Sequence, residues 1–152
     1  MNGSAGAAPR NAGRDGSQAA AGTVTTTGAL AVGAPNGSIT LDQSNAIGLL
    51  GAVTRGGTFT LNDTGGGLTL TGDVGSDASA VSITTVGGAL ALGTHNITTT
   101  GAGGHLTLNG VSVTQTTGTP LVAGQTTVRA GRGHAHLHAP PNDLTRAVSP
   151  SA

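Results

Sequence analysis

The sequence contains no cysteine, no tryptophan, no tyrosine and a single phenylalanine among its 152 residues. Without cysteine the chain cannot form a disulfide framework or a cysteine-based metal site. Because aromatic side chains are nearly absent, a hydrophobic core must be built from Leu, Val, Ile and Ala. Lysine and glutamate are missing as well, and the loss of these two good helix formers beside 28 Gly and 25 Thr argues against a helical protein.

Charge and long apolar runs are also scarce. Charged residues make up 8% of the chain and the formal net charge is zero, so the basic footprint of a nucleic-acid-binding protein is missing. A neutral chain is equally unsuited to electrostatic attachment to an anionic membrane. No apolar run approaches the roughly 20 residues of a membrane-spanning helix, and residues 1–22 lack the apolar segment of a secretory signal. We therefore expect no nucleic-acid partner and no membrane span.

Composition divides the chain into three zones. Residues 1–22 are rich in Gly, Ala, Ser and Asn without apolar periodicity, which predicts a disordered linker. Residues 23–128 carry repeated apolar–polar–apolar triplets and are expected to form one repeat domain. Residues 129–152 lose the triplets and gain Arg, His and Pro, which predicts a disordered tail.

The triplets recur at intervals of 20–25 residues. A first family has steps of 20, 22 and 25 residues: Ile39-Thr40-Leu41, Phe59-Thr60-Leu61, Val81-Ser82-Ile83 and Leu106-Thr107-Leu108. A second family comprises Leu30-Ala31-Val32, Leu68-Thr69-Leu70, Leu90-Ala91-Leu92 and Val111-Ser112-Val113. The segment of residues 46–53 fills the gap between its first two members, with Leu50 lying 20 residues before Leu70. A third column is expected through Val53, Val74 and Ile97.

This period predicts a solenoid, and strand-sized repeats with Gly-rich corners indicate a parallel β-helix. In each triplet, strand alternation places both apolar side chains on one face and the polar residue on the other. A single coil buries nothing alone, whereas stacked coils bury a continuous apolar column. We predict an all-β parallel β-helix of about four to five coils with disordered flanks. A disordered Gly/Thr-rich segment and an antiparallel β-sandwich are alternatives that do not explain the period.

Polar residues and glycines lie where the coils must turn. The residue after each strand of the first family is polar, which predicts a stacked polar column: Asp42, Asn62, Thr84 and Asn109. Pairs or triplets of glycine precede several strands, where the chain must bend sharply. The segment Pro35-Asn36-Gly37 is expected to form a β-turn.

Three segments point to a family: GGGLTLTGDV, VSITTVGGALALGTHNITTTG and GGHLTLNGVSV. Through them the stretch from about Thr23 to Val128 resembles bacterial filamentous-haemagglutinin-like exoproteins, the secreted partners of two-partner secretion systems, and is similar to autotransporter passengers. The resemblance implies a right-handed β-helix that is extracellular or on the bacterial cell surface and often adhesive. It also implies an outer-membrane transporter for export, with glycans or surface proteins of host or neighbouring cells as partners.

Histidines are the first candidates for a metal site. His134, His136 and His138 alternate, so an extended chain would project them on one side, where they could hold a divalent cation. Asp143 is the nearest carboxylate, and the surrounding Pro and Gly argue against a preformed site. The remaining histidines are expected at solvent-facing corners: His95 and His105.

Two groups of acids are candidates for calcium binding or catalysis. Asp73, Ser76 and Asp77 could approach a calcium ion, but they lack the ligand density of an EF-hand, so a polar turn is the better interpretation. Asp42 and Asp63 could fall on neighbouring coils, as the paired carboxylates of a glycosidase do, yet neither is obviously buried or beside an aromatic sugar platform. We therefore assign no catalytic, cofactor-binding or metal-binding residue and predict no cofactor.

These patterns favour a non-enzymatic adhesin or exoprotein fragment that acts as a β-helical stalk or display surface. The alternative is a fragment of a β-helical carbohydrate-active enzyme, a polysaccharide hydrolase or lyase. Threonine clusters at residues 25–27, 58–60 and 98–100 also suggest an ice-binding function, which would require outward threonines in one aligned column. The unequal spacing of the triplets argues against such a column. The open ends of such a rod are expected to favour self-association, since neither flank resembles a cap.

Overall fold

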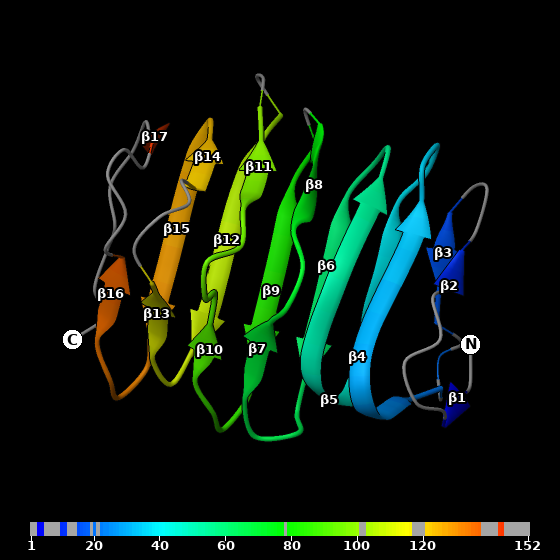
Figure 1. Cartoon of the computed structure of the whole chain (residues 1–152), viewed down its shortest axis with the longest axis horizontal. Coiled ribbons are helices and arrows are strands. Elements are labelled where there is room, and N and C mark those ends of the chain that lie inside the picture. Colours follow the sequence, from blue (N-terminus) through cyan, green and yellow to red (C-terminus); the bar gives the residue numbers. More distant parts are fainter. Residues whose placement is uncertain are drawn as a thin grey trace.

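The computed structural model describes residues 3–4, 10–11, 15–18, 20, 22–77, 79–100, 103–116, 121–137 and 143–144. In these residues every regular secondary-structure element is a β-strand. The same residues contain no helix that is long and apolar enough to cross a membrane. The chain winds into coils stacked along its long axis, from β1 (Gly3–Ser4) at one end to β17 (Asp143–Leu144) at the other (Figure 1). The protein is a parallel β-helix, or β-solenoid, of about five complete coils, with short additional strands paired at both ends.

Each full coil has three walls, and each wall is a column of parallel strands. The first wall contains β3 (Gly16–Ser17), the start of β5 (Ile39–Arg55), β6 (Phe59–Asp63), β9 (Val81–Thr85), β12 (His105–Gly110) and β15 (Gln125–Ala130). The second wall contains β1 (Gly3–Ser4), the start of β4 (Val24–Ala34), the middle of β5, β7 (Leu68–Leu70), β10 (Leu90–Ala91), β13 (Val113–Gln115) and β16 (Ala135–Leu137). The third wall contains β2 (Arg10–Asn11), the ends of β4 and β5, β8 (Val74–Asp77), β11 (Ile97–Thr99), β14 (Leu121–Ala123) and β17 (Asp143–Leu144).

The predicted apolar column of the first wall is confirmed. Phe59 pairs with Ile39 on one side and with Val81 on the other, and Val81 pairs with Leu106. All four side chains are at most 2% exposed. Burial of one such side chain contributes about 1.5–3 kcal/mol, so the core gains its stability by repeating this contact from coil to coil.

The third predicted column is also confirmed and is longer than expected. Val53 pairs with Val74, and Val74 pairs with Ile97. The same column continues to Val32 in the preceding coil and to Leu121 in the following one. All of these side chains are buried.

The second family is correct in the middle of the chain and wrong at Val111. Leu68 pairs with Leu90 as predicted, but Leu90 pairs with Val113 and not with Val111. Val111 is 37% exposed in the bend between β12 and β13. The physical reason is that β12 continues to Gly110, so the next two residues are used to turn the corner.

The assignment of the whole triplet Leu30-Ala31-Val32 to the second family is also wrong. Leu30 pairs with Leu50, in the second wall. Val32 instead pairs with Val53, in the third wall, and the register shifts between these two pairs. Strand β4 therefore passes around a corner without interruption, which a short triplet cannot reveal.

The corners largely follow the predicted turn chemistry. The Gly37 amide donates a 2.9 Å hydrogen bond to the Ala34 carbonyl, as expected for a β-turn through Pro35 and Asn36. Gly66 has a φ of 102°, and a Cβ atom on Gly88 would lie 1.3 Å from the Gly66 carbonyl oxygen. Glycine is thus required where two successive corners stack.

Described strands lie on both sides of the predicted domain boundaries. Strands β1–β3 precede residue 23, β15 extends to Ala130, and β16 pairs with β13. The boundaries at residues 22/23 and 128/129 stay predictions.

Candidate functional site

The outer face of the first wall carries a row of hydroxyl side chains. Its members pair in register from strand to strand: Thr40, Thr60, Ser82, Thr107 and Thr127. Because side chains alternate along a strand, each member lies between two buried residues and projects outward. Each is at least partly exposed. We call these five residues the hydroxyl row.

A second outward row follows two residues further along each strand. Asn62 pairs with Thr84, and Thr84 pairs with Asn109, which confirms this part of the predicted polar column. Arg129 pairs with Asn109 and continues the row at one end. At the other end Asp42 is not part of the row, because the register of β5 shifts after Leu41. Both rows are therefore uncharged across β6, β9 and β12. We call Asn62, Thr84 and Asn109 the second row.

The prediction that unequal spacing would prevent an aligned outward column is wrong. Successive members of the hydroxyl row are separated by 20, 22, 25 and 20 residues, yet they pair in register. The extra residues lie in the corners and in the other two walls, so the strands of the first wall keep their alignment. By contrast, the threonine clusters near residues 25, 60 and 98 belong to three different walls.

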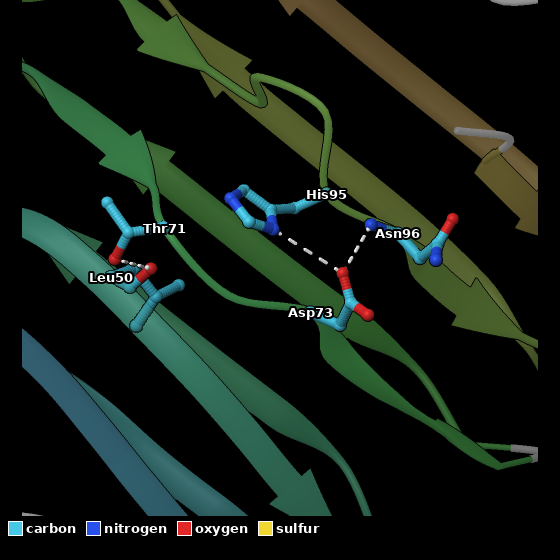
Figure 2. Close-up of polar contacts among 5 residues, drawn as sticks. All are labelled: Leu50, Thr71, Asp73, His95 and Asn96. Carbon is cyan, nitrogen blue, oxygen red and sulfur yellow. Dashed lines mark hydrogen bonds and ion pairs between the residues drawn. The ribbon is translucent and has the colours of Figure 1, made fainter. Parts of the chain in front are cut away.

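A second polar cluster lies at the corner between the second and third walls. Asp73 Oδ1 accepts a 2.9 Å hydrogen bond from the Asn96 backbone amide and lies 3.5 Å from His95 Nδ1 (Figure 2). In the same corner the Thr71 hydroxyl donates to the Leu50 carbonyl at 3.2 Å. The Asp73 and His95 side chains are 59% and 30% exposed, so solvent weakens this contact. The cluster ties adjacent coils together at their corners.

The proposed calcium ligands are only partly placed. Asp73 uses Oδ1 on the backbone of the next coil, as a polar turn residue does. Ser76 and Asp77 belong to β8, but their side chains lie outside the described residues. Because Ser76 and Asp77 lie in a strand, the interpretation of this segment as a polar turn is wrong for these two residues, whereas Asp73 lies in the corner before β8.

The candidate carboxylate pair lies on opposite sides of the first wall. Asp42 is exposed, and its Oδ1 accepts a 2.8 Å hydrogen bond from the Gln43 side chain. Asp63 is completely buried and points into the solenoid. Its Oδ1 accepts hydrogen bonds from the backbone amides of Ile47 and Gly65 at 2.7 Å and 3.4 Å. The two carboxylates therefore do not face a common solvent-filled space.

Asp63 belongs to an inward polar column that the sequence analysis missed. It pairs with Asn45 in the preceding coil and with Thr85 in the following one, and all three are buried. Asn45 Oδ1 accepts from the Val24 amide at 2.9 Å, as Asp63 does from Ile47. The period-2 alternation Phe59, Leu61, Asp63 contains the signal, because it places residue 63 on the inner face.

Burial governs the protonation of Asp63. Desolvation raises the pKa of its carboxyl above 3.8, although hydrogen bonds from the Ile47 and Gly65 amides act in the opposite direction. Asp63 Oδ2 is buried without a hydrogen-bond partner in the described part of the chain. The Asp63 carboxyl is therefore protonated more readily in the folded protein than in the unfolded chain.

Arg55 is a second buried ionisable residue that the sequence analysis missed. It ends β5 and is 5% exposed. Its guanidinium donates to the carbonyl of Gly57 and to the carbonyls of Ser79 and Thr98 at 3.3 Å and 3.5 Å. These bonds connect the ends of successive coils, so Arg55 has a structural position at the corner between the third and first walls.

The histidine segment is described only in part. His134 and His136 are exposed, and His136 pairs with Thr114 in the second wall. His138 lies outside the described residues, so the interpretation of the three histidines stays a prediction. In the part of the chain that the structure describes, no three His, Cys, Asp or Glu side chains gather as a metal site would require. His105 is exposed and His95 partly exposed, as predicted for solvent-facing residues. His95 lies in a corner, but the predicted corner position of His105 is wrong, because His105 is the first residue of β12.

Comparison with known proteins connects the repeats to a family. No curated protein and no solved structure matches the sequence. The family described as "Repeats of unknown function (DUF5649)" matches residues 72–151, which is 80 of the 152 residues. The matched region begins in the corner before β8 and extends past β17, so it contains several of the stacked coils. The chain therefore belongs to the DUF5649 family of repeats of unknown function.

Proposed function

We propose that this chain is part of a non-enzymatic exoprotein, in which the β-helix acts as a stiff stalk and a display surface. The observation that carries the proposal is the outer face of the first wall. Its hydroxyl row and second row repeat from coil to coil without a charged residue across β6, β9 and β12. A regular face of short polar side chains is suited to contact with an extended partner, because every coil offers the same kind of hydrogen bond.

The resemblance to filamentous-haemagglutinin-like exoproteins supports the cellular setting of this proposal. The segments that carry the resemblance coincide with stacked strands of the solenoid, namely β7 to β13. On this basis the protein acts outside the cell or at the bacterial cell surface, after export through an outer-membrane transporter. Its partners are glycans or proteins on host or neighbouring cells, and its open ends pair with further coils or with a second copy.

The placement of the acids supports a binding role over catalysis. Glycosidases need two carboxyl groups that face the same bond, one of them with a raised pKa. Burial raises the pKa of Asp63, but its carboxyl points into the core, while Asp42 is on the surface. No specific arrangement of side chains in the described residues favours the carbohydrate-active enzyme over the display surface.

Two assays on the purified chain test the proposal. Beads coated with the protein should adhere to bacterial or host cells, whereas incubation with a polysaccharide panel should release neither reducing ends nor unsaturated products. Uncoated beads and beads coated with heat-unfolded protein provide the controls. Polysaccharide cleavage that Asp42→Asn abolishes, without cell adhesion, would establish the enzyme instead.

A further inference from the structure

We propose that the outer face of the first wall binds a neutral, unbranched polysaccharide that lies along the solenoid axis. The proposal rests on the display function above and names the ligand class for that surface. The face consists of the hydroxyl row and the second row, which both run parallel to the axis. The inference follows from the spacing, the charge and the chemistry of these side chains.

The spacing of the two rows forms a regular lattice. Neighbouring strands lie about 4.8 Å apart, and residues two apart on one strand are separated by roughly 6.6 Å. Thr60 and Asn62 on β6 are repeated by Ser82 and Thr84 on β9, one coil further along the axis. A linear polymer of sugar rings has a repeat of comparable length and offers hydroxyl groups on every ring. Such a polymer meets the same pair of polar groups in each coil.

The chemistry of the rows favours a neutral partner. Hydroxyl and amide groups both donate and accept hydrogen bonds, as sugar hydroxyls do. The rows contain no cation across β6, β9 and β12, so an anionic polymer would gain no charge complementarity there. In the part of the chain that the structure describes, the five hydroxyls of the hydroxyl row form no hydrogen bond within the protein. They are therefore available to a ligand.

Because the single aromatic side chain is buried, the affinity of the face for a sugar polymer should depend on the length of the polymer. Phe59 is the single aromatic residue and is fully buried, so no aromatic ring is available to stack against a sugar. Each coil contributes only weak hydrogen bonds, although the stiff β-branched threonines lose little freedom on binding. Useful affinity requires several coils to engage one polymer simultaneously. We therefore expect binding of long chains and little binding of short oligosaccharides.

The test uses the full chain, with affinity electrophoresis and calorimetry as the readouts. The probes are glucomannan and mixed-linkage β-glucan as neutral unbranched polymers with extended, β-linked chains, the matching short oligosaccharides, and alginate as an anionic polymer. Thr60→Val together with Thr107→Val removes two hydroxyls of the row and keeps the β-branched shape. The matched control is Thr69→Val with Thr114→Val, because these threonines are exposed on the second wall.

The proposal expects at least one neutral polymer to bind, with its oligosaccharide bound far more weakly. The Thr60/Thr107 pair should weaken polymer binding about tenfold, the effect of losing two hydrogen bonds, while the control pair should change it less than twofold. Ser82→Arg, which adds a large charged side chain to the middle of the face, should also reduce binding. Circular dichroism and thermal melting show whether each variant is folded. If the Thr60/Thr107 double variant does not fold, the binding measured for Ser82→Arg tests the proposal in its place.

Several results would overturn the proposal. These are preferential binding of alginate, equal affinity for short oligosaccharides, unchanged binding by both Ser82→Arg and the folded Thr60/Thr107 pair, no binding of any neutral polymer, or inhibition of ice growth without polymer binding. The last result would make ordered water the ligand of the rows. If cell adhesion persists in any of these cases, this inference fails and the proposed display function stands. If adhesion is absent and polysaccharide is cleaved, the display function itself fails.

Discussion

The carboxylate of Asp63 holds the backbone of Ile47 across two adjacent coils, through a 2.7 Å hydrogen bond from the Ile47 amide to Asp63 Oδ1. The contact lies inside the solenoid, where Asp63 is completely buried. An acid in this position has a structural role in corner geometry, at the energetic cost of removing a carboxylate from water.

This position predicts an unusual dependence of stability on pH. Because burial raises the pKa of Asp63 above its unfolded value of 3.8, the folded state binds the proton more tightly. The contribution of Asp63 to stability is therefore fully present below pH 3.8 and is lost as the pH rises through the raised folded-state pKa. Urea unfolding at a series of pH values should show this fall in the free energy of unfolding.

Two variants isolate the contribution of Asp63 to that fall. Asp63→Asn keeps the acceptor oxygen for Ile47 and removes the titrating group, so it should flatten the pH dependence and raise stability at neutral pH by about 1 kcal/mol. Asp42→Asn removes an exposed acid and is the control for the loss of one carboxyl group outside the core. If both variants retain the wild-type slope, Asp63 does not titrate as proposed.

The stacked corner glycines predict a large difference between two Gly→Ala substitutions. A Cβ atom on Gly88 would lie 1.3 Å from the Gly66 carbonyl oxygen, so Gly88→Ala should cost several kcal/mol or prevent folding. Gly48 has no atom within 4 Å of such a Cβ, so Gly48→Ala should be neutral or stabilise by about 0.4–1 kcal/mol. Thermal and urea unfolding measure both effects. Similar stabilities for the two variants would show that these corners do not stack.

The corrected register at the start of β13 predicts opposite sensitivities for two valines. Val113 is fully buried opposite Leu90, so Val113→Ala should lower the free energy of unfolding by about 2 kcal/mol. Val111 is 37% exposed, so Val111→Ala should change it by less than about 0.5 kcal/mol. Urea unfolding measures both losses, and comparable losses at the two positions would support the original triplet, in which both valines are buried.

The sequence predicts the fold where apolar residues alternate without interruption. The column through Phe59 and Val81 could be predicted because both strands keep the alternation and the corners are marked by glycine. Val111-Ser112-Val113 misleads because an apolar residue is used in a bend, where it is exposed, and the pattern cannot distinguish a bend from a strand.

The candidate surface and the buried polar groups were harder to predict for two physical reasons. Corner insertions change the spacing along the sequence without changing the register of the first wall, so the alignment of Thr60 with Thr107 through Ser82 was not evident. Asp63 and Arg55 are ionisable, so composition favours placing them outside, although backbone amides and carbonyls are their partners inside.

The most direct test of the account is cross-linking of the hydroxyl row, which the absence of native cysteine makes simple. Thr60 and Ser82 face each other on adjacent coils, about 4.8 Å apart, whereas Thr107 lies one coil beyond Ser82. Thr60→Cys/Ser82→Cys should therefore be joined readily by oxidation or by a short bifunctional thiol reagent, and Thr60→Cys/Thr107→Cys should not. Mass spectrometry of dilute, folded protein gives the cross-linked fraction of each pair. Efficient linkage of the first pair alone is the predicted result, and equal linkage of both pairs, or linkage of the second pair alone, would contradict the stacked register.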